Sequence, residues 1–472
     1  MQLSRKSPLV LLVLPLLYAA GAPAPAAAQA AEGAISGADT SWMLISTALV
    51  LLMTPGLAFF YGGLVNSRNA LNTMMMSFVA LGVSMVLWAV VAYSLAFGEG
   101  GTLVGDFSMA MLSGVGTEPS GTIPHMLFMA FQGTFAVITA ALISGALIGR
   151  MRFVPYVAFI AIWGLVVYAP VAHWVWGGGW LSELGALDFA GGTVVHVNAG
   201  IAALVAALVL GSRREYARTA LLPHNVPFVL LGAGLLWFGW FGFNGGSALA
   251  ADGIAALAFV NTLLAPAAAL VVWAFLDYFR SGKATAVGVA TAIVVGLVAI
   301  TPASGFISPA YALLLGAISA FPSYFVLQWR ARTRLDDSLD VFAAHGIGGI
   351  TGAILTGFFA SAAVNGMDAD GLFFGNPGQV GIQLIAILAV AAYSGAATFI
   401  ILKVIGLVSP LRPSEKEEAR GMDILNHGEE AYASSSGAIL LLDEEMNGGS
   451  SAESSPGTPA GSTASAHTTD TV

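Results

Sequence analysis

Long apolar segments dominate this sequence and restrict it to one class of fold. Each of eleven segments is long and apolar enough to cross a bilayer as a helix. Their expected ranges are 41–65, 71–97, 123–149, 153–175, 191–211, 225–247, 254–279, 284–301, 305–328, 338–361 and 380–408. Because a helix satisfies its own backbone hydrogen bonds inside lipid, the pattern predicts an all-α polytopic membrane protein. The composition agrees, since 9% charged residues could not cover a soluble chain of 472 residues.

The first 30 residues differ from the rest and are typical of a secretory signal peptide. Arg5 and Lys6 form a basic start, residues 9–20 form a short apolar core, and Ala-Gln-Ala at 28–30 is a small-residue cleavage site. The alternative is a first helix that stays uncleaved. The core is too short to span a bilayer, which favours cleavage and leaves a membrane domain over residues 31–409.

Charged residues between the segments sort by side, and this gives the predicted orientation. The gaps after odd-numbered segments hold the basic residues Arg68, Arg150, Arg152, Arg213, Arg214, Arg218, Arg280, Lys283, Arg330, Arg332 and Arg334. The gaps after even-numbered segments hold acids and neither Lys nor Arg. Because Lys and Arg concentrate in cytoplasmic loops, we expect the N-terminus outside and the C-terminus in the cytoplasm. The expected location is the inner (cytoplasmic) membrane of the cell, crossed many times.

The chain changes character after residue 409. Residues 410–432 are charged and are predicted to form a cytoplasmic tail, whereas residues 433–472 are rich in Ser, Gly, Thr and Ala and are predicted to be disordered. The sequence has no cysteine, so disulfides and thiolate chemistry are excluded. No nucleotide loop, metal-binding cluster, nucleophile–base pair or nucleic-acid-binding basic patch is visible. We therefore predict no cofactor, no metal and no enzymatic activity.

Two histidines lie deep inside predicted membrane segments. His196 follows Asp188 by about 12 Å along one helix, and His345 follows Asp340 on another. An ionisable group at that depth is costly, so each should face a cavity or a partner, and at least one of the two should be neutral. These are the fifth and tenth segments, which cross the membrane in opposite directions. Such an arrangement is typical of a five-plus-five inverted repeat whose two halves meet near the midplane.

Aromatic residues near helix ends are further candidates. Phe131 and Phe135 share one helix face, although ordinary packing explains that spacing as well. Trp176 ends its segment beside three glycines, where an interfacial belt is the alternative. Phe243 and Ser247 lie at the end of the sixth segment, where Ser247 offers a hydroxyl oxygen.

Residues 188–200, Asp-Phe-Ala-Gly-Gly-Thr-Val-Val-His-Val-Asn-Ala-Gly, closely resemble the signature of the ammonium transporter family, which includes methylammonium permeases and is related to the Rhesus proteins. The resemblance extends in order through 55–63, 172–179, 240–247, 258–262, 301–305, 340–346 and a tail motif that ends in Tyr432. It therefore covers nearly the whole mature chain. Residues 433–472 have no counterpart in the short-tailed members.

The resemblance implies a homotrimer of eleven-helix protomers, each with its own pore for ammonium or methylammonium. An outer ammonium site would fall on Trp176, Phe131, Phe135 and Ser247, and a stacked gate on Phe135 and Phe243. His196 and His345 would line the pore, and Asp188 would shape the outer vestibule. Asp340, near the entrance of the other histidine segment, is a second candidate vestibule or structural acid. The tail would dock on the cytoplasmic face and help a PII-type nitrogen-regulatory protein to plug the exits.

Two other functions stay open at this point. An ammonium sensor would transmit its state through the cytoplasmic tail, and a C-terminal signalling domain would favour it. An ion-coupled transporter of larger amines or amino acids would need charges in the core, for which only Asp188 and Asp340 are candidates. An apolar pore with neutral histidines instead fits the passage of ammonia, because bare ions are rejected by desolvation.

Overall fold

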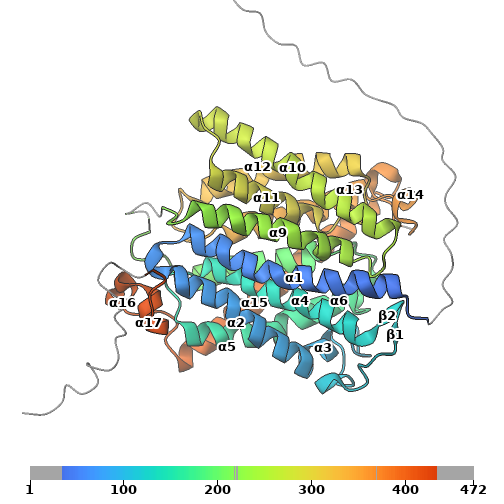
Figure 1. The fold of residues 1–472 in the computed structure, drawn as a ribbon, viewed down its shortest axis with the longest axis horizontal. Coiled ribbons are helices and arrows are strands. Elements are labelled where there is room, and N and C mark those ends of the chain that lie inside the picture. The colour runs from blue at the N-terminus through green and yellow to red at the C-terminus, as the bar shows by residue number, and fades with distance from the viewer. Residues whose placement is uncertain (1–33, 217, 219–221, 368, 433–472) are drawn as a thin grey trace, which may run out of the picture.

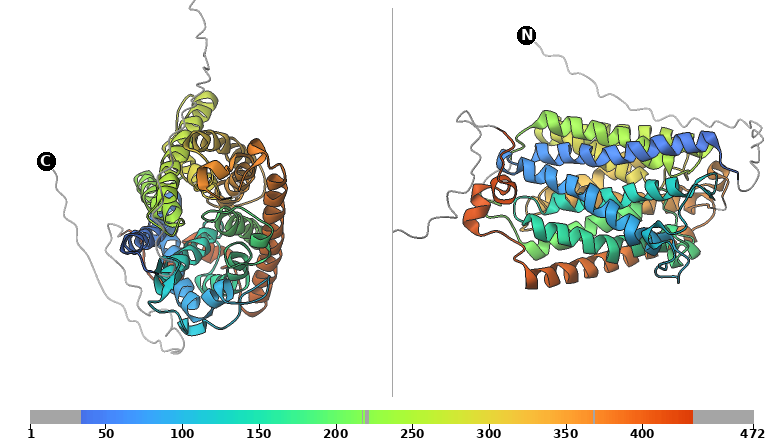
Figure 2. Two further views of the ribbon diagram at one scale, coloured as in Figure 1. Left: turned by 90° about the vertical axis from the view of Figure 1, so that its right-hand side faces the viewer. Right: turned by 60° about the horizontal axis from the view of Figure 1, so that its bottom comes forward.

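The computed structural model describes residues 34–216, 218, 222–367 and 369–432. The predicted signal peptide (1–30) and the C-terminal extension (433–472) lie outside these described residues. Long helices run side by side along one direction and form a single bundle (Figures 1 and 2). The short helices α16 and α17 cover one end of the bundle, and the hairpin β1–β2 lies at the other (Figure 1). We call these the basic end and the hairpin end.

The longer helices are α1 (Gly37–Leu64), α2 (Ala70–Leu87), α4 (His125–Ile143), α5 (Phe153–Trp163), α6 (Ala169–Trp176), α8 (Asn198–Leu210), α9 (Val226–Gly246), α10 (Gly253–Ser281), α11 (Ala286–Ile300), α12 (Pro309–Arg330), α13 (Gly348–Phe359) and α15 (Gly378–Val408). The short ones are α3 (Tyr93–Phe97), α7 (Trp180–Glu183), α14 (Ala362–Asn365), α16 (Glu415–Arg420) and α17 (Met422–His427). Strands β1 (Pro119–Ser120) and β2 (Ile123–Pro124) pair antiparallel, with Ser120 opposite Ile123.

In the described part of the chain, four π-helical stretches interrupt or begin the long helices: η2 (Trp88–Ala92), η5 (Gly164–Tyr168), η6 (Gly192–Val197) and η7 (Phe342–Ile347). The remaining short turns are 3₁₀-helical: η1 (Ser67–Asn69), η3 (Ala110–Leu112), η4 (Ser144–Ala146) and η8 (Leu372–Phe374). Single π-helical turns are rare and concentrate at functional sites. The two that carry the candidate histidines, η6 and η7, therefore mark the interior of the bundle as the place to look for function.

The predicted membrane class is confirmed, but one predicted segment is shorter than expected. Within the described ranges, ten helices are long and apolar enough to cross a membrane. The predicted segment 284–301 forms α11, whose 15 residues extend only about 22 Å. Its second half is buried from Ala292 to Ile300, so its apolar residues contact other helices instead of lipid. The count of eleven crossings and the orientation of the termini remain predictions.

Glycines allow α1 and α9 to pack closely. A Cβ atom on Gly232 would approach the backbone N of Phe60 to 2.3 Å, and one on Gly239 would approach Met53 Cγ to 2.3 Å. Small residues let membrane helices come together in this way. The indole of Trp42 then donates to the carbonyl of Gly245 at 3.2 Å, which fixes the end of α9 beside the start of α1 at the hairpin end.

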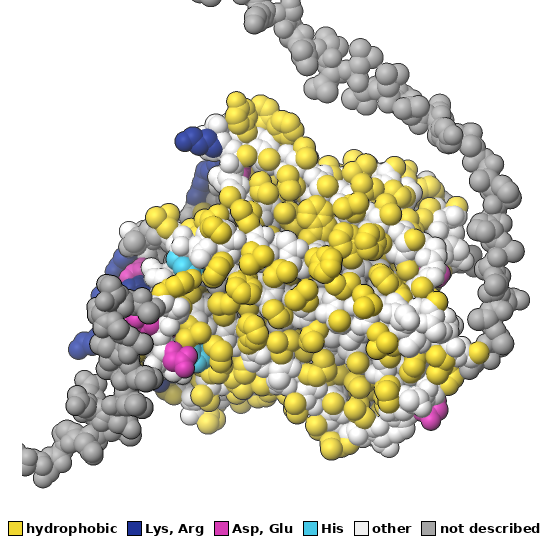
Figure 3. All heavy atoms as spheres, viewed as in Figure 1, with side chains coloured by type: hydrophobic (Ala, Val, Ile, Leu, Met, Phe, Trp, Pro, Cys, Tyr) yellow, Lys and Arg dark blue, Asp and Glu magenta, His cyan; other side chains and the backbone are white. Residues whose placement is uncertain are grey.

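Charged side chains concentrate at the basic end, next to the tail helices, while the rest of the visible surface is largely apolar (Figure 3). Asp423 of α17 caps α2 there, because its two carboxylate oxygens accept the backbone N–H groups of Leu71 and Asn72 at 3.0 and 2.7 Å. Tyr432 donates to or accepts from His224 at 2.8 Å. The predicted tail 410–432 is thus folded against the bundle as far as its last described residue.

Candidate functional site

Two π-helical turns bring the histidines together. Gly200, just after η6, lies so close to η7 that an added Cβ would come within 2.3 Å of Gly346 Cα. Gly349 also lies close to η6, with its Cβ position 3.0 Å from His196 Cβ. Any larger side chain at these crossings would separate the two segments. The glycines that the sequence places beside each histidine therefore set the distance between the two rings.

His196 and His345 face each other in the interior of the bundle. Their Nδ1 atoms lie 3.2 Å apart, and their ring centroids lie 5.3 Å apart at an interplanar angle of 28°. Both side chains are buried. A hydrogen bond between two Nδ1 atoms requires that only one of them carries the proton. The pair therefore has a defined direction at any moment, and exchanging tautomers would reverse it.

A narrow apolar cavity adjoins the histidine pair. Its volume of about 10 Å³ is close to that of a single small molecule such as water. Besides the two histidines, its lining residues are Met53, Leu57, Ile138, Leu142, Leu236, Trp240, Phe243 and Val294. None of these additional side chains carries a charge, so the cavity offers no group that would replace the hydration shell of a metal ion.

Stacked aromatic rings close the cavity on the side of the hairpin end. Phe135 and Phe243 lie 4.1 Å apart between centroids and are nearly parallel, at 25°. Phe135 contacts Phe131 at 4.9 Å and Trp176 at 5.9 Å, both edge to face. Phe243 in turn lies 6.1 Å from the ring of His196. The structure thus brings the predicted aromatic residues into one continuous row that leads to the histidines.

Trp176 and Ser247 differ from the other members of this row because both stay partly exposed. The Ser247 hydroxyl donates its proton to the carbonyl of Phe243 at 2.8 Å. Its oxygen lone pairs therefore remain available to accept from a ligand. The Trp176 indole N–H is also occupied, since it donates to the carbonyl of Asp188 at 2.9 Å, which leaves the ring face as the part that can bind a cation.

Asp188 precedes and caps η6, the π-helical turn that carries His196. Its buried carboxylate accepts four consecutive backbone N–H groups, those of residues 191 to 194, at 2.6 to 3.0 Å. Gly191 makes this possible by adopting a left-handed φ of 114°. Burial raises the pKa of Asp188 from its ordinary value, and the four N–H donors hold that rise in check. The residue is a structural cap that also positions Trp176 through its carbonyl.

Asp340 lies in the wall of the vestibule described below, but it does not cap η7 in the way that Asp188 caps η6. Asp340 forms an ion pair with Arg330 at 2.6 Å. Asp337 instead accepts the backbone N–H of Phe342, the first residue of η7, at 2.7 Å. The spacing explains this, because Asp337 precedes His345 by eight positions, as Asp188 precedes His196. That repeated spacing was visible in the sequence.

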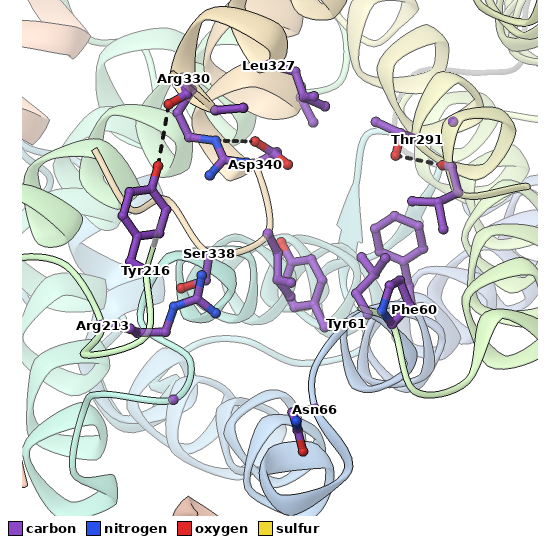
Figure 4. A pocket seen from close by; sticks show the side chains of 18 of the residues that line it. Phe60, Tyr61, Asn66, Arg213, Tyr216, Thr291, Leu327, Arg330, Ser338 and Asp340 are labelled. Atoms are coloured by element: carbon purple, nitrogen blue, oxygen red, sulfur yellow. Dashed lines mark hydrogen bonds and ion pairs between the residues drawn. The ribbon is translucent and has the colours of Figure 1, made fainter. Parts of the chain in front are cut away.

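A large vestibule opens from His345 toward the basic end. Its volume is about 760 Å³, and its wall includes Tyr61, Arg213, Arg330 and Asp340 (Figure 4). The Tyr216 hydroxyl donates to the carbonyl of Arg330 at 3.4 Å across one side of this wall. The two cavities share His345 as a lining residue. Aromatic row, histidine cavity and vestibule therefore follow one another through the protein.

A buried ionic network holds the loops at this end. Arg150 is fully buried and reaches Asp336 at 3.5 Å and the Ser338 hydroxyl at 2.6 Å. Arg213 binds the same Asp336 with two nitrogens, at 2.8 and 2.7 Å. Burial alone would raise the pKa of Asp336. The hydrogen bonds from Arg213 and the charge of Arg150 outweigh burial and hold the pKa below its ordinary value. The carboxylate therefore stays ionised and joins three segments far apart in sequence.

Trp240 is a site residue that the sequence analysis missed. Its ring stacks on His196 at 5.3 Å and 22°, and its indole donates to the Thr301 hydroxyl at 2.8 Å. The signal was present, because Trp240 lies three positions before Phe243 and therefore on the same helix face. Among the described residues, no group of three His, Asp or Glu side chains is placed to hold a metal ion.

Comparison with known proteins gives a consistent result. The model of the Ammonium Transporter Family matches residues 41–432. The chain is 48% identical over 401 residues to an ammonium transporter of Bacillus subtilis (strain 168), an alignment that covers 84% of this chain and 99% of that protein. The crystal structure of Candida albicans Mep2 superposes with a TM-score of 0.77 and 37% identity, over 81% of this chain and 88% of that one. A sensor Amt protein superposes with a TM-score of 0.78 and 30% identity, over 83% and 98%.

Proposed function

This chain belongs to the Ammonium Transporter Family, and from this we propose that it recruits ammonium at Trp176 and Ser247, removes one proton and conducts ammonia past His196 and His345. The observation that carries the proposal is the buried histidine pair in a narrow apolar cavity behind the stacked rings of Phe135 and Phe243. The protein would lie in the inner membrane of the cell. Its hairpin end would face outward, and its basic end would face the cytoplasm. This orientation follows the distribution of Lys and Arg.

Selection of ammonium over potassium would occur at the partly exposed end of the aromatic row. The two cations are nearly the same size, so a sieve cannot separate them. Ammonium can donate a hydrogen bond to the free lone pairs of Ser247 while its charge lies over the ring of Trp176. Potassium can do only the second. Phe131 and Phe135 would complete the apolar wall of this site.

Passage through the interior would require the neutral molecule. Moving an ion into an apolar cavity without compensating ligands is very costly, and the lining beside the histidines offers none. Ammonia loses far less on desolvation and can accept or donate a hydrogen bond at the imidazoles. The proton left behind can pass along the Nδ1–Nδ1 hydrogen bond by tautomer exchange, separately from ammonia.

Replacing Trp176 with leucine should weaken discrimination against potassium more than it changes the maximal rate. A desolvated cation–π contact contributes roughly 1 to 2 kcal/mol, which corresponds to about a five- to thirtyfold loss of selectivity. The measurement is methylammonium uptake into proteoliposomes at increasing potassium. Trp180→Leu is the control, because its ring contacts Trp174 and not the aromatic row. Unchanged selectivity in Trp176→Leu would remove the residue from the site.

The tail would serve regulation by a partner. We propose that a PII-type protein binds at the basic end, where 410–432 packs beside the mouth of the vestibule. Glu418 both binds Arg412 at 2.6 Å and lines that vestibule, which connects the tail to the exit. We also propose a homotrimer, in which apolar side chains exposed on α1 and α9, such as Leu44 and Phe238, would face either lipid or a second copy.

Truncation tests the role of the tail. Ending the chain after Pro410 should lower uptake and abolish PII binding, because it removes the Asp423 cap on α2. Ending it after Tyr432 should change neither, since the docked segment is kept. Uptake and pull-down with purified PII protein measure both. Loss of activity from the removal of 433–472 alone would contradict the assignment of the tail.

A sensor is the second candidate function, supported by the similarity of the fold to a sensor Amt protein. In that case ammonium at Trp176 would change the contact between Asp423 and α2 without sustained transport. Uptake of methylammonium by the purified protein would exclude a role as a sensor alone.

A further inference from the structure

A second group of aromatic and acidic side chains lies in the vestibule, away from the histidines. Trp273 and Asp277 are four residues apart on α10 and therefore share a face. Tyr324 reaches the same cavity from α12, and Thr285 reaches it from the start of α11. Three helices thus converge on one part of the vestibule wall.

Asp277 differs from the other acids of that wall in its charge balance. Glu215 binds Arg68 at 2.9 Å, and Asp340 binds Arg330 at 2.6 Å. Glu418 is likewise bound by Arg412. Among the described residues, no ion pair with Asp277 is found. Its charge is therefore the one in this wall that a mobile cation can still neutralise.

The surroundings of Asp277 leave one oxygen available. Oδ2 accepts the Thr285 hydroxyl at 2.8 Å and the Thr285 N–H at 3.4 Å, which fixes the carboxylate beside the start of α11. In the described part of the chain Oδ1 accepts no hydrogen bond from protein. The hydrogen bonds to Oδ2 hold the carboxylate in a defined position, and Oδ1 can accept a hydrogen bond from a ligand.

The aromatic side chains beside Asp277 are buried, but one of their polar groups lacks a close hydrogen-bond partner. Tyr324 is 3% exposed and Trp273 is 2% exposed, and their rings meet edge to face at 5.0 Å. The buried Tyr324 hydroxyl lies near Asp277, but among the described residues it makes no hydrogen bond within 3.5 Å. Leaving a buried hydroxyl without a close partner is energetically unfavourable. This unpaired oxygen beside an unpaired carboxylate indicates a place for a ligand that donates hydrogen bonds and carries positive charge.

We propose that Trp273, Asp277 and Tyr324 form a second binding site for ammonium or methylammonium, on the basic side of the histidine pair. The cation donates one hydrogen bond to Asp277 Oδ1 and one to the Tyr324 hydroxyl, with its charge against the aromatic rings. The site rests on the proposed function, since it receives the substrate at the opposite mouth of the same path. It holds the cation where the vestibule leads to bulk water.

Thallium(I), a heavy monovalent cation of about the size of ammonium, is a probe for this site. Crystals of the full chain soaked in a thallium salt should show anomalous density between Asp277 and Tyr324. Ammonium in excess should remove it and sodium should not. Asp277→Asn, which keeps an acceptor for Thr285, and Tyr324→Phe should each raise the thallium concentration needed to half-occupy the site by about tenfold. Glu215→Gln, in the same vestibule but paired with Arg68, should leave it unchanged.

Absence of this density, equal density in Asp277→Asn, or equal displacement by sodium would overturn the inference. Methylammonium uptake by the same wild-type protein separates this failure from failure of the proposed function. Uptake without density at Asp277 would reject only the second site. Density at Asp277 without any uptake would reject transport and retain a cation site.

Discussion

Replacing His196 and His345 together with leucine is expected to abolish the ammonium-driven current while neutral ammonia still passes. Two leucines keep the cavity apolar but remove the Nδ1–Nδ1 hydrogen bond, which is the proposed route of the proton. A proton then has no carrier across an apolar gap, and an unaccompanied charge there is very costly. The current should fall to that of protein-free liposomes.

The measurement combines electrical recording on reconstituted protein with a pH-sensitive dye that reports entry of ammonia. His125→Leu is the matched control, because His125 contacts the Tyr93 hydroxyl at 2.6 Å and does not line the histidine cavity. Replacing His345 alone with glutamate should have the opposite effect and admit potassium, since a fixed negative charge would compensate a bare cation. Full current in the double leucine variant would end the proton-relay account.

Replacing Asp188 with alanine is expected to prevent correct folding of the transport path. The change leaves the N–H groups of residues 191 to 194 without their acceptor in a buried position. Each unsatisfied buried group costs about 1 to 3 kcal/mol, and whole domains are stable by only about 5 to 15 kcal/mol. The turn that carries His196 should therefore lose its conformation, and Trp176 should lose the carbonyl that orients its indole.

Thermal unfolding in detergent, followed by size-exclusion fluorescence, measures this effect. Asp188→Asn keeps one acceptor oxygen and should lie between alanine and wild type. Asp252→Ala is the control, because Asp252 caps α10 on the exposed surface with two N–H groups at 2.9 Å. Loss of such a cap typically costs only about 1 kcal/mol. Equal stability of the Asp188 and Asp252 variants would contradict the structural role given to Asp188.

The sequence predicts those features that depend on patterns along single segments. Apolar length gives the helices and the membrane class, and the motif around His196 gives the family, which the comparisons confirm. The contact between His196 and His345 also follows from the sequence, because two deep ionisable groups on opposed segments need a partner. The signal peptide and the orientation of the chain remain predictions.

Features that depend on packing between segments were harder to predict. Apolar content does not distinguish lipid contact from helix contact, so the buried α11 resembled an ordinary crossing. Hydrophobic pattern also does not reveal π-helical turns such as η6, whose start is capped by Asp188. The sequence places two acids, Asp337 and Asp340, before the segment that carries His345. Only the three-dimensional position of η7 shows which acid caps it.

The position of Trp240 illustrates the same limit. Its spacing to Phe243 places both on one face, but the sequence does not say that this face meets His196. The cavity exists because α9 packs closely on α1 through Gly232 and Gly239, which lets residues from both helices line it. Its small volume and apolar lining are therefore properties of the assembled bundle.

The central claim is that a charged cation is recognised at the hairpin end but only a neutral molecule crosses the histidine cavity. Simultaneous recording of current and labelled methylammonium uptake in proteoliposomes, with potassium as competitor, tests it most directly. We predict saturable uptake that a large excess of potassium does not inhibit, with no current carried by potassium alone. Potassium current, or inhibition of uptake by potassium at concentrations equal to those of methylammonium, would contradict it.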